Sequence, residues 1–350
     1  MKKIKINRIL LASIFMTAIG GLQALYDHVT LHSISSLGPS ALYDFESNFW
    51  LGIGSGGISG MIAAITLNYV DDKFRMKPYY QGLLIIILVF LSIWITRNII
   101  DGLLLMQNGK GFQFLVDASD FRNLSFWMLI VMLTYFFFQM GNKFGPGKIF
   151  KIFLGRYNLP QREERVFMFL DLKSSTAIAE QLGELKYHHF LKEVFADLTN
   201  PILDHRGEIY QYVGDEIVLS WDLGKSGNRA KYLDCFCAIQ ELVDQQESKY
   251  LKKYGFKPQF KAGAHCGNVI AGEVGVIRRD ITYSGDVLNT AARIQSLCNE
   301  LKSSLLVSKD LFTMNHSDHS AIRFEQKGEM VLKGKLMPME LFGVSMGESK

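Results

Sequence analysis

Four stretches without a charged side chain dominate the first 142 residues of the chain. They cover residues 9–26, 47–70, 79–96 and 123–142. Each is about 18 residues long or longer, which is enough for an α-helix to cross the apolar part of a bilayer. A core helix of a soluble protein would interrupt such a run with charges on its outer face. The pattern therefore predicts a transmembrane domain of four helices over residues 1–141.

Lysine and arginine indicate how these helices are oriented, because cytoplasmic loops carry an excess of both residues. The first loop has neither residue, and the third loop is mixed. The basic residues lie before the first stretch (Lys2, Lys3, Lys5, Arg8), between the second and third (Lys73, Arg75, Lys77) and after the fourth (Lys143, Lys148, Lys151, Arg156). We therefore expect a multi-pass protein in the lipid bilayer of the plasma (inner) membrane, with both termini in the cytoplasm. The first stretch also resembles a signal peptide, whose cleavage would leave three spans.

The second stretch contains a glycine repeat. In "GIGSGGISG", Gly52, Gly56 and Gly60 are four residues apart and share one helix face. Small residues at this spacing let helices approach closely in lipid. The repeat predicts either packing within one bundle or a contact between two chains. No acidic residue lies within the four stretches, which argues against an ion pathway or a transporter.

The composition changes after residue 142. Residues 142–163 have glycine and proline at both ends and a basic, apolar middle, which predicts a short amphipathic linker helix at the membrane surface. Residues 164–344 predict an α+β domain, a mixed sheet with helices on one face. This length is sufficient for an independent core. Residues 345–350 form a tail.

Local patterns give the expected order of elements in this domain. An apolar strand, "VFMFLD", ends at Asp171, and a helical pattern follows it. The remaining elements are a β-hairpin over 207–221, a helix over 228–253, two strands around Gly267 and Asn268, a helix with Asp286 as its N-cap, and short strands near residues 305, 323 and 340.

Asp171 and Asp215 are the first candidates for chemistry. Asp171 ends a buried strand, and Asp215 lies at the tip of the hairpin "IYQYVGDEIVLSW". If these strands are neighbours, the two carboxylates offer hard oxygen ligands for Mg²⁺ bound together with substrate phosphates. The helix start "LKSST", with Ser174, Ser175 and Thr176, adds backbone N–H groups suited to phosphate. Spacing alone leaves open that the two aspartates are unrelated caps.

Three segments resemble the core signatures of class III nucleotidyl cyclases of the membrane-anchored bacterial type. They are "FLDLKSSTAIAEQLG", "GEIYQYVGDEIVLSW" and "ITYSGDVLNTAARI", in the order and spacing of that family. The resemblance covers roughly residues 164–344. It implies the family's ferredoxin-like fold and its reaction, in which the ribose 3′-oxygen of a nucleoside triphosphate attacks the α-phosphorus.

The resemblance also implies roles for individual residues. Asp171 and Asp215, with the backbone of Leu172, match the ligands of two Mg²⁺ ions per site, for which Mn²⁺ substitutes. Asn289 and Arg293 match the pair that orients the ribose and stabilises the transition state. Lys333 matches the triphosphate-binding lysine, with Lys335 as a near alternative. Because the family builds its site between two chains, the resemblance implies a homodimer with two sites.

Two further positions match the side chains that read the purine. They are Gln211, four residues before Asp215, and Thr282, three residues before Gly285. Adenylate-forming members pair Lys with Asp or Thr, so Gln211 departs from their pattern, whereas Thr282 fits it. The Gln amide has a donor end and an acceptor end and suits either purine. We expect ATP as the substrate and a membrane-bound adenylate cyclase serving intracellular signalling, with a guanylate or dual-specificity cyclase as the alternative.

Other classes of protein fit less well. A catalytically inactive sensor or dimerisation module would lack a metal aspartate or Arg293, and all are present. A diguanylate-forming enzyme would carry a Gly-Gly-acid-acid-Phe hairpin, which "YVGDEIV" is not. A net charge of +4 without a basic stripe gives no sign of a nucleic-acid partner. The four cysteines lack metal-site spacing and are expected to be reduced thiols.

Overall fold

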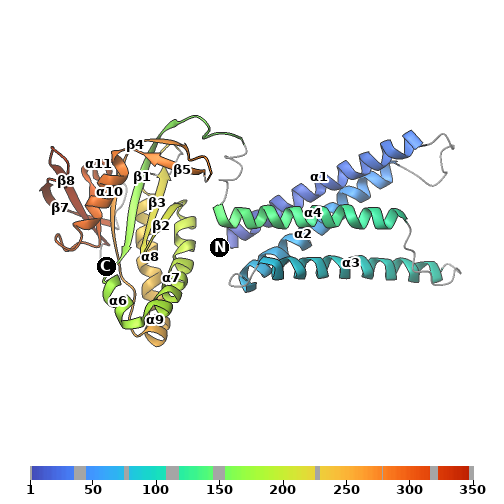
Figure 1. The fold of residues 1–350 in the computed structure, drawn as a ribbon, viewed down its shortest axis with the longest axis horizontal. Coiled ribbons are helices and arrows are strands. Elements are labelled where there is room, and N and C mark those ends of the chain that lie inside the picture. Colours follow the sequence, from blue (N-terminus) through green and yellow to red (C-terminus); the bar gives the residue numbers. More distant parts are fainter. Residues whose placement is uncertain are drawn as a thin grey trace. The chain divides into compact units, whose positions relative to one another are not determined.

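The structure is a computed structural model that describes residues 2–34, 45–74, 79–107, 118–144, 154–224, 229–277, 279–315 and 322–346. The chain divides into two compact units, Met1–Phe144 and Gly145–Lys350 (Figure 1). Of the amphipathic helix expected over 142–163, residues 145–153 lie outside the described residues, and residues 161–163 belong to a strand. Residues 154–159 of that segment form turns and bends.

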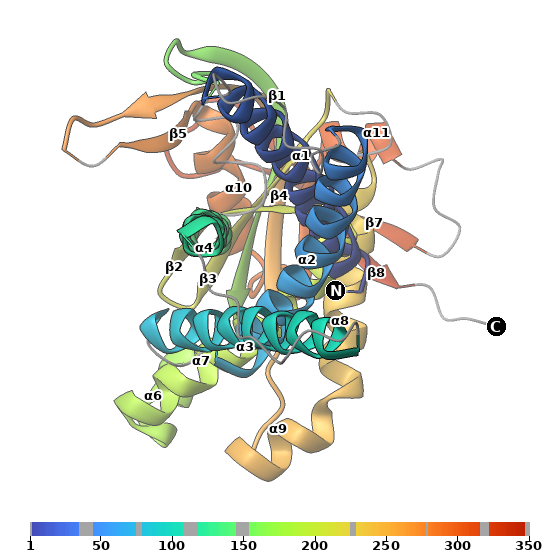
Figure 2. The same ribbon diagram turned by 90° about the vertical axis from the view of Figure 1, so that its right-hand side faces the viewer.

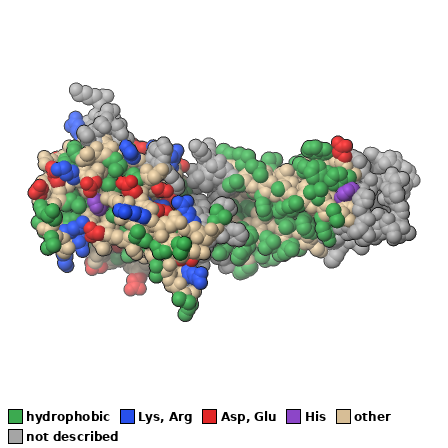
Figure 3. Space-filling view, turned by 90° about the horizontal axis from the view of Figure 1, so that it is seen from above, with side chains coloured by type: hydrophobic (Ala, Val, Ile, Leu, Met, Phe, Trp, Pro, Cys, Tyr) green, Lys and Arg blue, Asp and Glu red, His purple; other side chains and the backbone are tan. Residues whose placement is uncertain are grey.

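The first unit consists of helices. They are α1 (Lys2–Ile34), α2 (Phe45–Phe74), α3 (Tyr79–Gln107) and α4 (Ala118–Phe144). Within the described residues, three apolar stretches are long enough to cross a membrane: Ile9–Val29, Gly52–Val70 and Leu124–Gly141. The apolar stretch of α3, Tyr80–Thr96, is shorter, so three candidate spans stand where four were expected. Hydrophobic side chains cover much of this unit in the space-filling view (Figure 3).

The glycine repeat of α2 packs against α1 of the same chain. A Cβ placed on Gly56 would lie 2.5 Å from the carbonyl oxygen of Met16, and one on Gly60 would lie 2.7 Å from the Met16 Cβ. A Cβ on Gly52 would lie 2.8 Å from the carbonyl oxygen of Gly20. The two backbones therefore approach as closely as glycine permits. Of the two predicted roles, the structure shows packing within the bundle.

The second unit is built on a mixed sheet. Its strands are β1 (Gln161–Leu172), β2 (Glu208–Val213), β3 (Glu216–Asp222), β4 (Phe260–Val274), β5 (Asp280–Ser284), β6 (Leu305–Ser308), β7 (Ile322–Met330) and β8 (Met339–Met346). They pair in the order β2-β3-β1-β4-β6-β8-β7, and β5 pairs with β4. Only β4 and β6 are parallel neighbours among the described strands, so the predicted mixed sheet is confirmed. Figure 2 shows β4 and β5 as a hairpin that projects from the body of the sheet.

Helices cover both faces of this sheet, and the expectation of helices on one face is wrong. The helices are α6 (Ser175–Leu182), α7 (Glu184–Asp204), α8 (Lys231–Gln245), α9 (Glu247–Tyr254), α10 (Asp286–Ser296) and α11 (Lys309–Asn315). Val166 and Met168 of β1 join the core formed with α7 and α8. Phe167, on the opposite face of β1, packs with Val287 and Ala291 of α10. Because β1 is apolar on both faces, each face needs a covering layer.

Two local predictions are also corrected. The segment around Gly267 and Asn268 does not turn, and β4 runs through it without interruption. Gly267 instead makes room for α10, since a Cβ there would lie 2.9 Å from a methyl group of Val287. Asp286 is the first residue of α10, and Gly285 occupies the N-cap position. The helix expected over 228–253 is divided at Gln246 into α8 and α9, whereas the hairpin and the three late strands are confirmed.

Gly56 and Gly54 form a matched pair for testing the α1–α2 contact. We expect Gly56→Ala to destabilise the protein by about 1–3 kcal/mol, because the added Cβ meets the backbone of Met16. A Cβ added to Gly54 would have open space within 4 Å, so Gly54→Ala is expected to be neutral or slightly stabilising. The measurement is the midpoint of thermal denaturation in detergent. Equal midpoints for the two variants would contradict this packing of α1 on α2.

Candidate active site

The end of β1 brings three acidic residues together. Asp171 pairs with Glu216 of β3 on one side and with Lys261 of β4 on the other. Asp215 directly precedes Glu216, in a tight turn that follows β2 and contains Gly214 at φ 62°. The turn uses glycine because this backbone conformation disfavours other residues. β1 and β3 are neighbours, as the two-aspartate interpretation requires.

Two side chains hold the carboxylate of Asp171. Lys261 Nζ lies 3.2 Å from Asp171 Oδ2, and the amide of Gln295 donates a hydrogen bond of 2.7 Å to the same oxygen. The side chain of Asp171 is 19% exposed and that of Lys261 is 15% exposed. Asp171 is therefore held in one orientation at a largely buried position, with a cation beside it.

Burial and neighbouring negative charge raise the pKa values of Asp171 and Glu216. Burial and the neighbouring carboxylate of Asp215 raise the pKa of Asp171, although Lys261 opposes the shift. Burial, together with Asp171 and Asp215, raises the pKa of Glu216 to about 7. Burial also raises the pKa of Tyr187, and Asp215 adds to this effect. The end of β1 is thus a place where negative charge is crowded and only partly compensated.

This donor set fits a divalent cation that prefers oxygen ligands. Carboxylate oxygens are the ligands of Mg²⁺, which usually binds through one or two carboxylates and keeps other positions for water or phosphates. Among the described residues, no group of three or more His, Cys, Asp or Glu side chains forms a ready-made metal cage. Asp171 and Asp215 are therefore suited to an open site, in which substrate completes the coordination. Leu172 follows Asp171 directly and brings its backbone to the same end of β1.

The predicted phosphate-binding residues lie just beyond this point. Ser174 adopts a left-handed conformation with φ 57°, and α6 starts at Ser175. The side chain of Ser174 makes no capping hydrogen bond, and Thr176 is exposed in the first turn of α6. The start of this helix presents backbone N–H groups a few residues after Asp171, where an anion is favoured.

Helix α10 places the predicted Asn289 and Arg293 away from Asp171 of the same chain. Gln295, on the same helix, points at Asp171. At 100° per residue, Arg293 and Asn289 lie about 160° and 120° around the helix from Gln295. Gln295 of α10 therefore contacts Asp171 of its own chain, and the predicted transition-state pair lies on other faces of the helix.

The loop between β7 and β8 lies beside Arg293. A Cβ placed on Gly334 would be 3.4 Å from Arg293 Nη2. Lys335 forms an ion pair with Asp286, which lowers the pKa of that carboxyl group. Lys333 is exposed on the same loop. Lys333, Asn289 and Arg293 thus belong to one region, and Lys335 is already paired, which favours Lys333 as the residue left for a ligand.

The two predicted purine-reading residues lie on β2 and β5. A β-bulge at Tyr210 shifts the register, so that Gln211 pairs with Val218 and shares its face of the sheet. Thr282 pairs with Gly272 of β4, and its hydroxyl lies 3.4 Å from the Gly272 carbonyl oxygen. Through Val218, which pairs with Phe169, Gln211 is level with the position two residues before Asp171, whereas Thr282 joins β4 eleven residues beyond Lys261.

By their expected roles, the candidate residues divide into two groups. One group contains Asp171, Leu172, Asp215 and the start of α6, and the other contains Gln211, Thr282, Asn289, Arg293 and Lys333. We call them the carboxylate group and the α10 group.

The sequence interpretation did not assign roles to Lys261 and Gln295. Lys261 is the one charge in the apolar run "FKAGAH", which is a signal that a buried partner exists. Gln295 gave no comparable signal, because its role depends on how closely α10 lies against the sheet. That approach is allowed by Gly263, where a Cβ would collide with the backbone nitrogen of Gln295.

Comparison with known proteins gives a family match over this unit. A family model described as the adenylate and guanylate cyclase catalytic domain matches residues 159–345. The chain is similar to adenylate cyclase 2 of Rhizobium meliloti (strain 1021), with 34% identity over 203 residues, which cover 58% of this chain and 56% of that protein. It is also similar to a receptor-type guanylate cyclase of Caenorhabditis elegans, with 25% identity over 184 residues, covering 52% of this chain and 18% of that protein.

A solved structure shares the fold. The structure of a bacterial light-regulated adenylyl cyclase superposes with a TM-score of 0.53 and 18% identity, covering 64% of this chain and 66% of that one. The chain spans only about half, or less, of the length of these two curated relatives. The family match rests on the model that covers residues 159–345, and the solved structure shows the fold alone.

The carboxylate group can be tested by metal binding alone. We expect Asp171→Asn and Asp215→Asn each to weaken Mn²⁺ binding at least about tenfold, because each removes one hard, charged oxygen ligand. Mn²⁺ binding is measured by electron paramagnetic resonance of the free ion. Glu193→Gln, on α7, is the control and should bind as the wild type does. Unchanged binding in both aspartate variants would contradict the proposed site.

Proposed function

The chain belongs to the adenylate and guanylate cyclase family, and on this basis we propose that it is a membrane-bound adenylate cyclase. The reaction converts ATP to 3′,5′-cyclic AMP and pyrophosphate. The ribose 3′-oxygen forms a bond to the α-phosphorus, and the bond from that phosphorus to the oxygen of the β-phosphate breaks. The single observation that carries this proposal is the presence, on one chain, of both the carboxylate group and the α10 group.

The carboxylate group would bind the metal ions and the triphosphate. Asp171 and Asp215, with the backbone of Leu172, would hold two Mg²⁺ ions, or Mn²⁺ in their place. When bound, such ions activate the attacking oxygen and neutralise charge on the phosphates. Ser174, Ser175 and Thr176 would contact the phosphates through the start of α6. Lys261 adds a positive charge beside Asp171.

The α10 group would act on the reacting centre and on the base. Asn289 would orient the ribose, and Arg293 would stabilise the charge that develops at the α-phosphate. Lys333 would bind the triphosphate. Gln211 and Thr282 would read the purine through hydrogen bonds.

The active enzyme would be a homodimer. On α10, Asn289 and Arg293 face away from the Asp171 that Gln295 contacts. A single chain therefore does not direct both groups at one substrate. Two chains related by a twofold axis would pair the carboxylate group of each with the α10 group of the other, which gives two equivalent sites.

ATP is the favoured substrate, and GTP is the alternative. Thr282 fits the adenylate-forming pattern, and the relative with 34% identity is an adenylate cyclase. Gln211 carries no charge, and its amide can present either end to a purine. Loss of one good hydrogen bond at such a position costs about 1–3 kcal/mol, so we expect selectivity of about ten- to a hundredfold. An inactive sensor module is the further alternative, and the complete residue set argues against it.

The helical unit would anchor the enzyme in the plasma membrane. Three described helices contain apolar stretches long enough to cross it. The distribution of lysine and arginine would place both termini and the cyclase unit in the cytoplasm. Cyclic AMP would then be released inside the cell as a signal.

The direct test is the cyclic nucleotide formed by the detergent-purified protein. We expect cyclic AMP from ATP with Mg²⁺ or Mn²⁺, and a loss of at least about a thousandfold in Asp171→Ala, because the metal site is essential to phosphoryl transfer. ATP and GTP are supplied separately. Cyclic GMP as the main product would show the guanylate alternative to be right. No product from a dimeric preparation would favour the inactive module.

Mixed dimers test whether the two groups meet between chains. Asp171→Ala and Arg293→Ala are each expected to be inactive, because each homodimer lacks one group in both sites. Co-expression in equal amounts should restore about a quarter of wild-type activity, since half of the dimers are mixed and each has one complete site. No recovery in mixtures that contain heterodimers, shown by two affinity tags, would contradict a shared site.

A further inference from the structure

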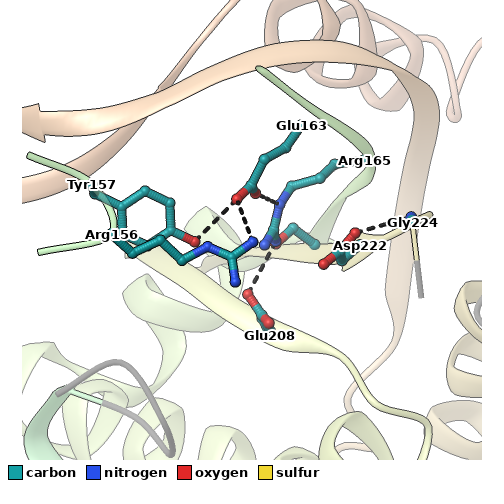
Figure 4. A network of polar contacts seen from close by, with 8 residues as sticks. Arg156, Tyr157, Glu163, Arg165, Glu208, Asp222 and Gly224 are labelled. Atoms are coloured by element: carbon teal, nitrogen blue, oxygen red, sulfur yellow. Dashed lines mark hydrogen bonds and ion pairs between the residues drawn. The ribbon is translucent and has the colours of Figure 1, made fainter. Parts of the chain in front are cut away.

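Arg165 is a fully buried charge at the opposite end of β1 from Asp171. Its side chain is 0% exposed. Arg165 Nε donates a 2.7 Å hydrogen bond to Glu163 of the same strand. Its Nη1 donates hydrogen bonds of 3.0 Å to Glu208 on β2 and 2.8 Å to Ser220 on β3. Figure 4 shows the guanidinium between the two carboxylates.

The guanidinium also faces an aromatic ring on β5. Its central carbon lies 4.7 Å from the centroid of the Tyr283 ring, which is within the range of a cation–π interaction. Among the described residues, Arg165 Nη2 has no hydrogen-bond partner. The Tyr283 ring is the contact that the guanidinium makes in addition to the hydrogen bonds of Nε and Nη1. We call Glu163, Arg165, Glu208, Ser220 and Tyr283 the Arg165 cluster.

The cluster joins the two strands that carry the predicted purine-reading residues. Glu208 lies three residues before Gln211 on β2, and Tyr283 directly follows Thr282 on β5. A second contact connects the same strands, because the rings of Tyr210 and Tyr283 are 5.1 Å apart and edge-on. Tyr210 is the residue of the β-bulge that puts Gln211 on the face of Val218. β2 and β5 do not pair as strands, so these side chains provide their connection.

Stability alone does not explain this arrangement. Desolvation of a buried ion pair offsets much of its attraction, and apolar side chains of similar size usually stabilise a core as well or better. Burial would lower the pKa of the Arg165 guanidinium, but Glu208 and Glu163 raise it above its usual range. A charged, hydrogen-bonded cluster provides a directional contact that fixes the strands relative to one another, and an apolar cluster does not.

We propose that Arg165, acting through Glu208 and Tyr283, is a positioning residue for purine selection: it fixes β2 relative to β5 and so sets where Gln211 and Thr282 stand. The proposal rests on the proposed function, since it needs a purine nucleotide as the substrate. It goes beyond that function by assigning a role to residues that are not expected to touch the base or the phosphates. Two hydrogen-bonding side chains discriminate between purines only if their separation is fixed, because a mobile amide would satisfy either base.

The test compares purine selectivity in variants of the cluster with that in matched controls. Glu208→Gln keeps the shape of the side chain and removes its charge, and its side chain is 30% exposed, so the variant should fold. Tyr283→Leu removes the ring, and Arg165→Lys keeps the charge without the planar fork. Glu193→Gln and Tyr254→Leu make the same changes in a cluster between α7 and α9, where Tyr254 donates to Glu193 at 2.7 Å.

The measured quantity is the ratio of kcat/KM for the preferred purine triphosphate to that for the other one, together with the melting temperature. We expect the ratio to fall at least fivefold in Glu208→Gln, Tyr283→Leu and Arg165→Lys. It should stay within twofold of wild type in the two controls, even where their melting temperatures fall as much. A general loss of stability would lower kcat for both nucleotides and leave the ratio unchanged.

Two other outcomes overturn the inference. An unchanged ratio in the folded cluster variants, or a wild-type ratio near one, would show that the cluster positions nothing that selects the base. Displacement of a fluorescent nucleotide analogue by ATP and by GTP gives the ratio of their binding affinities without turnover. Failure of the wild type to bind or convert either nucleotide would instead overturn the proposed function itself, so the two failures are distinguishable.

Discussion

The antiparallel pairing of β1 with both β3 and β4 is the constraint on which the cyclase unit depends. A slip of one residue would turn every side chain of β1 to the other face. In the observed register, Asp171 stands between Glu216 and Lys261, and Arg165 lies near the other end of the strand. Between Asp171 and Arg165, alternate apolar side chains of β1 belong to the two hydrophobic cores on the two faces of the sheet. One strand thus sets the distance between the carboxylates that we propose as cation ligands and a buried arginine that contacts side chains of β2 and β5.

The arrangement of α10 is the reason for proposing that a chain with all the candidate residues acts together with a second copy. Gln295 ties one face of the helix to Asp171, and the opposite face carries Asn289 and Arg293. The residues expected to bind the metals and those expected to act on the α-phosphate therefore have opposite directions within one chain. If the proposed function holds, activity would depend on how two chains meet, and a membrane anchor is one feature that could change this.

Much of this could be predicted from the sequence, for reasons that differ from residue to residue. Uncharged runs identified the helical unit, and hairpin chemistry placed Asp215 at a turn, because both depend on local pattern. That this turn lies beside the end of β1 came from the pairing of β1 with β3. The continuous β4 and the second covered face could not be predicted, since Gly267 looks like a turn residue until Val287 is seen packing over it. The partners of Asp171 and Arg165 come from strands and helices distant in sequence, and no local signal specifies such pairs. The residues and motifs of the active site carried the family resemblance, which the family match over residues 159–345 confirms.

Gly263 limits how helix α10 can move against strand β4. With no side chain at that position, the backbone of α10 rests directly on the backbone of β4. Backbone against backbone leaves no flexible layer in which the helix could slide or tilt. In the proposed dimer, α10 and the sheet of each chain would therefore move as one rigid body. The two groups of a shared site would then separate or approach only by rotation of one chain against the other.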